Sequence, residues 1–486
     1  SEAHFKAWSK AEITNKCNLD SLEGKIYKNL INELSKNIVK DEIKKRFPNE
    51  TVTRRNTGYA IDSLIDSKYF SNTNTKLNLS KLLAGSEGTL AFTTEIKLNL
   101  VSLPEPCEVV IAAHFSSIED SLKATVIAMQ SKPSACELMD KTILDCTKDN
   151  ITQQRNRFFI EGDPYAVLMI EFRAETFKEA LESSNNLIEK LKQIKLGFAF
   201  PIIKGEKTKS VWDLRAAGLG LLSNIPGDKK AVACIEDTAV AVTNLPSYIN
   251  EFTEMMASFG QESVYYAHAG AGELHLRPIL DLKKHEDVKL FREISEASAK
   301  LVTKYGGSLS GEHGDGRVRS EFIPINLGEN IYKLFKQIKD TLDSQNIFNP
   351  GKIVNAVKMD SNLRYETDKK VPEIETAFDF SHTGGILRTV EKCNGSGDCR
   401  KLNFAGGTMC PSYRATLDEK DSTRGRANVL REFLTQNTKK NPFNHPEIQQ
   451  ALELCISCKG CKSECPSNID MATLKAEFQY QYNKSH

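Results

Sequence analysis

Four closely spaced cysteines near the end of the chain constrain its fold more than any other feature. Cys455, Cys458, Cys461 and Cys465, followed by Pro466, form the pattern C-x2-C-x2-C-x3-C-P. This spacing is typical of an iron–sulfur cluster, because it lets successive thiolates turn toward one cubane. Structural zinc is the alternative, since paired C-x2-C motifs suit tetrahedral zinc, but zinc sites usually separate their two pairs by a longer stretch. The pattern therefore favours iron–sulfur chemistry.

A second cysteine group, Cys393, Cys399 and Cys410, precedes the first. Its first run reads C-x2-S-x2-C, with Ser396 in place of a middle cysteine, and Cys410 is followed by proline, as Cys465 is. In two-cluster ferredoxins the fourth cysteine of one run ligates the cluster of the other. The predicted ligands of one complete [4Fe–4S] site are Cys455, Cys458 and Cys461 with either Cys410 or Cys465. A second site lacks one thiolate; it could be [3Fe–4S], use a non-cysteine ligand or be absent.

Composition narrows the class of protein. The 486 residues suggest two to four domains, and 40% hydrophobic with 27% charged residues is the profile of a globular protein. A net charge of +1 gives no basic field for nucleic acid. Seven of the 12 cysteines lie in the last hundred residues at ligand spacing, which argues for metal and a reducing cytoplasm. With no 18-residue apolar run and no signal peptide, we expect a cytoplasmic protein, free or peripheral at the inner membrane face.

Hydrophobic patterns outline the elements. They predict a helix over residues 20–47, a short helix ending at Gly85 and a strand over 90–100. From residue 108, strands and helices alternate, with one strand over 231–242. This indicates an α+β or α/β sandwich whose sheet carries helices on one face. Polar residues without periodicity predict a linker before the cysteine loops, which alternate with short helices.

Histidines and a glutamate form a candidate metal site. His268 and His275 flank the turn AGAGEL, and Glu312 and His313 follow in SGEHGDG. Two histidines and one carboxylate are the usual ligands of a catalytic divalent metal, with zinc the first choice and manganese or iron as alternatives. Histidines near tight turns are also common as surface or satisfied core residues. The surrounding glycines favour the metal site, because they allow close backbone packing.

Several motifs together resemble a known family. HAGAGELHLRP, GGSLSGEHGDGR, NIFNPGKI and AGSEGTLAFTTEIKL are similar to segments of the FAD-linked oxidases of the vanillyl-alcohol oxidase superfamily, in the branch of D-lactate and D-2-hydroxyglutarate dehydrogenases. MCPSYRAT, STRGRA and the final cysteine run resemble long bacterial forms that join a flavin domain and an iron–sulfur domain. The resemblance covers nearly all of residues 50–486.

The resemblance implies a domain plan of the α+β class. The expected parts are the C-terminal part of an FAD-binding domain over 1–103, a ferredoxin-like α+β substrate domain with an antiparallel sheet over 104–357, a linker over 358–385 and a small helical 4Fe-4S domain over 386–486. The family's glycine-rich pyrophosphate segment is missing here. We therefore expect the other FAD-binding half to be supplied either in cis or by a second chain.

The resemblance also assigns roles to residues. The segment near the flavin matches Gly85, Ser86, Glu87, Gly88 and Thr89. The metal ligands match His268, His275 and Glu312, the general base matches His313, and the arginine for the substrate carboxylate matches Arg215. A lysine of the family is replaced by Ile235, and Lys229 or Lys230 could substitute for it. Arg317 and Arg319 could bind a second carboxylate, but we favour a solvated face.

The expected function is an FAD-dependent D-2-hydroxyacid dehydrogenase that passes electrons singly to an iron–sulfur cluster. D-2-hydroxyglutarate is the first substrate choice, D-lactate the second and glycolate the third, with an unidentified electron acceptor. One alternative is a split electron-transfer subunit that is inactive without a flavin-bearing partner. Another is a zinc-stabilised regulatory module. The sequence leaves open whether the chain forms a homo-oligomer.

Overall fold

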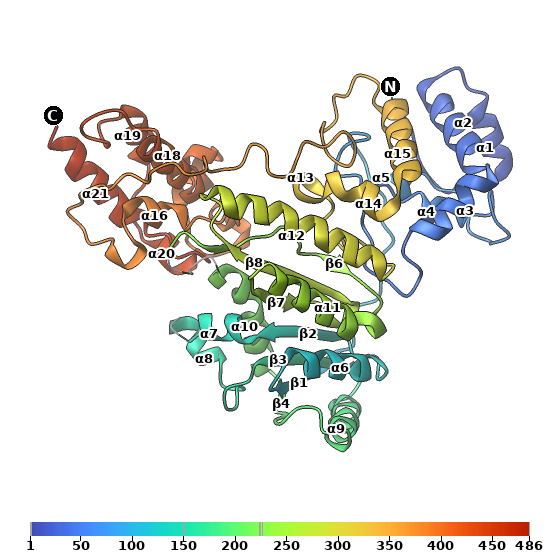
Figure 1. Cartoon of the computed structure of the whole chain (residues 1–486), viewed down its shortest axis with the longest axis horizontal. Coiled ribbons are helices and arrows are strands. Elements are labelled where there is room, and N and C mark those ends of the chain that lie inside the picture. The colour runs from blue at the N-terminus through green and yellow to red at the C-terminus, as the bar shows by residue number, and fades with distance from the viewer. Residues whose placement is uncertain (1, 149–150, 223–224, 226, 486) are drawn as a thin grey trace.

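The computed structural model describes residues 2–148, 151–222, 225 and 227–485. A central antiparallel sheet with its helices carries two further groups of helices. Figure 1 shows the N-terminal helices in blue and the C-terminal helices in red, on opposite sides above this sheet domain. The candidate site lies where loops of the sheet domain meet the N-terminal group.

All paired strands of the sheet run antiparallel, in the order β4-β1-β3-β2-β7-β8-β5, with β6 on β8. The longest pairing joins β1 to β3 over nine residues, from Cys107 opposite Ala174 to Phe115 opposite Ala166. The strands are β1 (Cys107–Phe115), β2 (Ala135–Asp140), β3 (Ala166–Ala174), β4 (Ile202–Lys204), β5 (Lys230–Ala231), β6 (Thr238–Ala239), β7 (Ser263–Ala267) and β8 (Glu273–Leu280). The α+β class with an antiparallel sheet is confirmed.

Helices cover both faces of the sheet, so the expectation of one covered face is wrong. The physical reason lies in β1 and β3, where seven of nine positions are buried and both faces are therefore apolar. One face packs against α6 (Ile118–Met129), α9 (Phe177–Gln193), α11 (Leu245–Ser258) and α12 (His285–Lys304). The other packs against α7 (Lys141–Cys146) and α10 (Lys207–Leu222), and α8 (Ile151–Asn156) lies beside α10.

The N-terminal helices share a core with a later part of the chain. Tyr27 and Leu30 are buried in one cluster with Phe335 and Ile338. The helices are α1 (Lys10–Cys17), α2 (Leu22–Leu34), α3 (Asn37–Arg46), α4 (Asp62–Ile65) and α5 (Ser80–Leu83), joined by α14 (Ile323–Leu327) and α15 (Glu329–Leu342). The single helix predicted over 20–47 is two helices, because Lys36 adopts an extended conformation between them.

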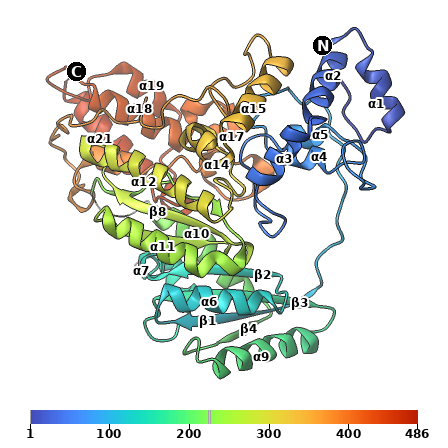
Figure 2. The same cartoon turned by 45° about the vertical axis from the view of Figure 1, so that its right-hand side comes forward.

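Two predicted strands are wrong. Residues 90–100 form no strand, because nothing in the described part of the chain pairs with them; Figure 2 shows the connection from α5 to β1 running clear of the body. Residues 231–242 are not continuous either. Only β5 and β6 form there, since Asp237 takes a left-handed conformation (φ 82°) that interrupts an extended chain.

The C-terminal region is a small helical unit around the cysteines. Val390, Leu430, Ile448 and Leu474 are buried together with cysteine side chains. The helices are α16 (Ile386–Glu391), α17 (Pro411–Thr416), α18 (Thr423–Thr435), α19 (Pro446–Glu453), α20 (Gly460–Glu464) and α21 (Met471–Asn483). Residues 357–380 connect this unit to the sheet domain without helix or strand. Within the described ranges, every helix is too short or too polar to cross a membrane.

Candidate functional site

Three predicted metal ligands come together. Donor atoms of His268, His275 and Glu312 all lie within 4.8 Å of one another. His268 follows β7, His275 lies in β8, and the turn between them needs Gly272 (φ 74°), where a Cβ would lie 2.0 Å from the Val240 carbonyl oxygen. The buried Nδ1 of His275 has no hydrogen-bond partner among the described residues. An unpaired buried nitrogen beside a carboxylate and a second imidazole fits a divalent cation.

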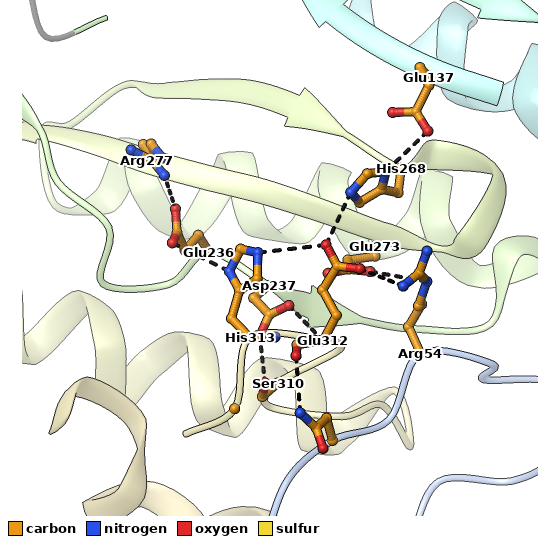
Figure 3. Close-up of polar contacts among 12 residues, drawn as sticks. Arg54, Glu137, Glu236, Asp237, His268, Glu273, Arg277, Ser310, Glu312 and His313 are labelled. Atoms are coloured by element: carbon orange, nitrogen blue, oxygen red, sulfur yellow. Dashed lines mark hydrogen bonds and ion pairs between the residues drawn. The ribbon is translucent and has the colours of Figure 1, made fainter. Parts of the chain in front are cut away.

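A carboxylate behind His268 fixes its orientation. The Nδ1 atom of His268 lies 3.0 Å from Glu137 Oε1, and its Nε2 lies 3.1 Å from Glu312 Oε1 (Figure 3). A proton on Nδ1, donated to Glu137, leaves the Nε2 lone pair for a metal. Sequence reasoning missed Glu137. The available signal was a glutamate in the apolar strand segment ACELMD.

Arg215 lies beside Glu137 and His268 and makes polar contacts with both. Its Nη2 donates to Glu137 Oε2 at 2.6 Å and lies 3.4 Å from His268 Nδ1. The guanidinium also stacks over the Tyr266 ring at 4.8 Å, and its buried Nε has no hydrogen-bond partner in the part of the chain that the structure describes. The arginine therefore reaches the candidate site with its Nε donor unused by the described residues. Its role toward a substrate carboxylate stays a prediction.

Asp237 shapes the loop that carries Glu312 and His313. This fully buried carboxylate accepts hydrogen bonds from the amides of Glu312 at 2.8 Å and His313 at 3.1 Å, and from the hydroxyl of Ser310 (Figure 3). A loop held by backbone amides on one buried anion keeps a defined shape. The left-handed backbone at Asp237, which interrupts the predicted strand, is thus part of the site.

His313 lies between two carboxylates. Its Nδ1 is 3.6 Å from Glu236 Oε1 and its Nε2 is 3.6 Å from Glu312 Oε1. Its ring stacks on His275 with 4.9 Å between centroids, and its side chain is 41% exposed. The contact with Glu236 raises the pKa of His313, and Arg277 in turn pairs with Glu236. The predicted base is therefore adjacent to the metal ligands and open to solvent.

A second buried acid and an arginine complete the surroundings. Glu273 is fully buried, and neither of its carboxylate oxygens has a hydrogen-bond partner among the described residues. Burial raises the pKa of Glu273 to about 9, and the nearby charges of Asp237 and Glu312 add to that effect. Arg54 lies 3.6 Å from Glu273 and pairs with Glu312 (Figure 3). The sequence patterns singled out neither residue.

The segment over residues 85–89 touches the same loop. The Glu87 carboxylate accepts from the amides of Asp315 at 2.7 Å and Gly316 at 3.0 Å. The hydroxyl of Thr89 is bonded to Ser86 and Tyr59 within the chain. Gly88 is exposed, and a Cβ added there would meet no atom within 4 Å, so the segment is open on this side. These features fit a flavin contact that supplies part of a binding site.

The seven predicted cysteine ligands form two adjoining groups, with Cys399 of one group beside Cys410 of the other. One cavity is lined by Cys410, Cys455, Cys458 and Cys461, and Cys465 is outside it. Burial raises the pKa of Cys465, and the thiolate charges of Cys393 and Cys399 raise it further, so these three lie near one another. Four thiolates around one cavity fit a [4Fe–4S] cluster, with Cys410 the better candidate for the fourth ligand.

Helix α18 begins between the two groups. The amide of Thr423 donates to Cys410 Sγ at 3.1 Å, and the amide of Arg424 donates to Cys399 Sγ at 3.4 Å. The positive end of a helix and amide donors stabilise negatively charged sulfur. One helix N-terminus thus serves both cysteine groups.

Of the remaining basic candidates, Arg319 reaches the loop of Glu312, where its Nη2 lies 3.7 Å from Asp237 Oδ2. Lys230 pairs with β8 and its ammonium bonds to the Ile225 carbonyl, and Ile235 is buried. Arg317 is exposed, as we expected from the sequence. Arg319 is buried and donates to the carbonyls of Gly314 and Glu236, so its expected solvated position is wrong. The loop's carbonyl oxygens need a buried donor, which a sequence pattern does not reveal.

Comparison with known proteins identifies the class. Residues 105–353, just over half of the chain, match the family model "FAD linked oxidases, C-terminal domain", and residues 392–470 match a 4Fe-4S dicluster domain. The chain belongs to the FAD-linked oxidase family, with FAD and an iron–sulfur cluster as the cofactors of these two domain types.

The curated relatives are longer proteins. A D-2-hydroxyglutarate dehydrogenase of Haemophilus influenzae is 29% identical over 482 residues, covering 88% of this chain and 45% of that protein. One of Escherichia coli K12 is 28% identical, covering 85% and 45%. A D-lactate dehydrogenase of Archaeoglobus fulgidus is 30% identical over 280 residues, covering 57% and 58%. The chain spans about half the length of these relatives.

Proposed function

We propose that this chain is the substrate, metal and iron–sulfur portion of an FAD-dependent D-2-hydroxyacid dehydrogenase. The observation that carries the proposal is the convergence of His268, His275 and Glu312, with His313 3.6 Å from the Glu312 carboxylate. The named activities of the relatives support D-2-hydroxyglutarate as first substrate and D-lactate as second. Residues 1–103, 104–357, 358–385 and 386–486 are the proposed flavin-contact part, substrate domain, linker and iron–sulfur domain.

The chain's own side chains would orient the substrate and move its proton. A divalent ion, with zinc the first choice, would polarise the substrate hydroxyl, and FAD would take up the hydride. His313 accepts the hydroxyl proton at Nε2, the nitrogen nearer Glu312. Glu236, next to Nδ1, favours the protonated imidazole that results. Arg215, whose Nε has no hydrogen-bond partner among the described residues, would bind the substrate carboxylate.

We propose two clusters with different ligand sets. Cys410, Cys455, Cys458 and Cys461 hold a [4Fe–4S] cluster. Cys393, Cys399 and Cys465 supply three thiolates, and Ser396 stands where a fourth would be, so a [3Fe–4S] cluster suits this group. The second group is the one beside α10: a Cβ at Gly220 would lie 2.5 Å from Pro466 Cβ. Clusters held by these two groups would supply one-electron transfer between the flavin and an unidentified acceptor, in the cytoplasm.

Calorimetry of the anaerobically purified chain tests the site before any turnover. We expect D-2-hydroxyglutarate to bind only after Zn²⁺, Mn²⁺ or Fe²⁺ is added, and the L-enantiomer to bind at least roughly tenfold more weakly. Glu312→Gln should abolish this metal-dependent binding. Glu251→Gln, which alters a surface carboxylate paired with Lys304, is the matched control.

Two binding results would count against the assigned site. Binding that ignores the metal, or that survives Glu312→Gln unchanged, would refute the assigned site. His313→Gln separates binding from proton transfer: the acid should still bind, while dye reduction by the complete flavin-loaded enzyme should fall by about 10²-fold or more.

A further inference from the structure

Three consecutive residues at the start of α18, Ser422, Thr423 and Arg424, lie between the two sets of cysteines. They begin the motif STRGRA, which contains no thiolate of its own. Ser422 caps the helix, and its hydroxyl accepts the Gly425 amide at 2.9 Å. Ser422 and Thr423 are buried, so their polar groups find partners inside the protein. We call the two sets the four-cysteine group (Cys410, Cys455, Cys458 and Cys461) and the three-cysteine group (Cys393, Cys399 and Cys465).

Thr423 makes two polar contacts with one sulfur of the four-cysteine group. Its amide donates to Cys410 Sγ at 3.1 Å, and its hydroxyl lies 2.9 Å from the same atom. A thiolate bound to iron carries no proton, so the hydroxyl is the donor there. Burial raises the pKa of Cys461, and a hydrogen bond from the Thr423 hydroxyl opposes that rise. Thr423 also lines the cavity of this group, and therefore reaches two of its four sulfurs.

Arg424 faces the three-cysteine group. Its amide donates to Cys399 Sγ at 3.4 Å. Its guanidinium pairs with Glu419 and donates to the Gly395 carbonyl at 3.3 Å, in the loop between Cys393 and Cys399. The pair with Glu419 raises the pKa of Arg424, and the thiolate charges of Cys399 and Cys393 add to that rise, so the positive charge lies near both sulfurs. Two neighbouring residues at one helix start therefore contact different groups.

Donors and positive charge beside a ligand sulfur change the reduction potential of a cluster. Reduction adds negative charge that is spread over the sulfurs, and a donor or cation there stabilises the reduced form more than the oxidised form. Burial strengthens the effect, because a low local dielectric screens it less. Removal of such a donor makes the potential of that cluster more negative. A cluster whose sulfurs the donor does not contact keeps its potential.

We propose that Thr423 and Arg424 set the reduction potentials of the two cysteine groups separately. Thr423 raises the potential of the cluster held by the four-cysteine group, and Arg424 raises that of the three-cysteine group. The inference rests on the proposed ligand sets, and neither residue is itself a ligand. It gives the motif STRGRA a role that cysteine spacing does not reveal, because one helix start acts on two adjoining sites of one-electron transfer.

Redox titration of the anaerobically purified chain, followed by electron paramagnetic resonance, measures both potentials without substrate. Thr423→Val removes the hydroxyl and keeps the amide. We expect the reduction equilibrium of its [4Fe–4S] cluster to shift at least roughly tenfold toward the oxidised form, a fall of about 59 mV for one electron. The three-cysteine cluster should keep its potential. Thr423→Ser, which retains the hydroxyl, should titrate like the unaltered chain.

Arg424→Gln is the reciprocal variant. It removes the positive charge near Cys393 and Cys399, so the reduction equilibrium of the three-cysteine cluster should shift at least roughly tenfold toward the oxidised form, while that of the [4Fe–4S] cluster stays within about threefold. Thr435→Val makes the same exchange as Thr423→Val about 18 Å away along α18 and is the matched control. The Thr435 hydroxyl has no hydrogen-bond partner among the described residues, and both potentials should stay unchanged.

Iron content and the spectra of the unaltered chain separate two kinds of failure. A chain that holds no cluster would refute the proposed ligand sets and this inference with them. If both clusters are present and neither Thr423→Val nor Arg424→Gln moves a potential, only the assigned roles are overturned. A shift of both potentials by either variant would also overturn them, because it would show a shared disturbance of the fold.

Two further results decide parts of the proposal. A chain with the [4Fe–4S] cluster alone would overturn the role of Arg424, and the titration of Thr423→Val would then decide the role of Thr423 by itself. If Thr423→Val assembles no [4Fe–4S] cluster, Thr423→Ala removes the same hydroxyl with a smaller side chain. The same tenfold shift is expected in that variant, and an unchanged potential would overturn the role of Thr423.

Discussion

Single acidic residues determine the shape and charge of the candidate site. Glu137 orients His268, Asp237 holds the loop of Glu312 and His313, and Glu87 holds the next turn of the same loop. Each accepts hydrogen bonds from groups that burial would otherwise leave unpaired. Asp315 belongs to this network but differs: its Oδ2 accepts from the Gly58 amide at 2.7 Å, while its buried Oδ1 has no hydrogen-bond partner within the described ranges.

Asp315 makes stability depend on pH. Burial raises the pKa of its carboxyl to about 7, compared with about 3.9 in an unfolded chain. The folded state therefore holds a proton that the unfolded state releases between about pH 4 and 7, so this residue's contribution to stability falls as pH rises through that window. Asp315→Asn removes the titration, and should be more stable than the original chain at pH 8 by up to ~4 kcal/mol.

Urea unfolding at pH 4.5 and pH 8 measures this effect. The advantage of Asp315→Asn should shrink toward zero at pH 4.5, where the original carboxyl is already neutral. A variant that is less stable than the original at pH 8 would show that the ionised carboxylate is the form the fold needs.

At the scale of elements, helix α10 joins the candidate metal site to the cysteine region. Arg215 on this helix contacts Glu137 beside the candidate metal ligands, and Gly220 five residues later lies against Pro466. Ion pairs reinforce the junction, with Arg388 and Lys283 both bound to Asp228. Through these contacts the helix sets the position of the cysteine loop relative to the candidate metal ligands.

Gly220→Ala should selectively disturb the second cysteine group. The added Cβ would lie 2.5 Å from Pro466 Cβ, so the loop carrying Cys465 must shift. We expect the loss of roughly three irons per chain and of the [3Fe–4S] signal in electron paramagnetic resonance, with the [4Fe–4S] signal kept. Ala216→Val, on an exposed position of the same helix, is the control and should keep both signals. Loss of both signals together would contradict two separate ligand sets.

At the scale of the whole molecule, the chain has separate cores that differ in what they contain. The two cores of the sheet domain contain none of the predicted iron ligands, whereas buried cysteines form part of the C-terminal core: Cys393, Cys399, Cys410, Cys461 and Cys465. Thiolates that lose their metal leave buried sulfur without its bonding partner, and a small unit has little other core to compensate.

Oxidative removal of iron should therefore unfold residues 386–486 and leave the sheet domain folded. Limited proteolysis should then cut within the C-terminal region while a fragment containing residues 107–353 resists. Circular dichroism should show the earlier of two melting transitions disappear. A single melting transition, equal before and after iron removal, would contradict independent cores.

Motifs whose residues carry ligand atoms within a short stretch could be predicted from the sequence. The ligand spacing of the cysteines, the pair His268 and His275 and the Glu312–His313 doublet each combine donor atoms within a short stretch. Residues that act on these from elsewhere were not. Glu137, Asp237 and Arg54 lie far from the motifs along the chain and meet them only after folding.

Local sequence thus determined which residues carry donor atoms, where apolar periodicity begins and ends, and that residues 90–100 have the pattern of a strand. Tertiary structure alone decided that both sheet faces are covered, that Cys410 joins the cavity of Cys455, Cys458 and Cys461, and that the strand pattern stays unpaired. The reason is that a side chain's type and spacing are local properties. Which groups contact one another depends on segments that are distant in the chain but close in space.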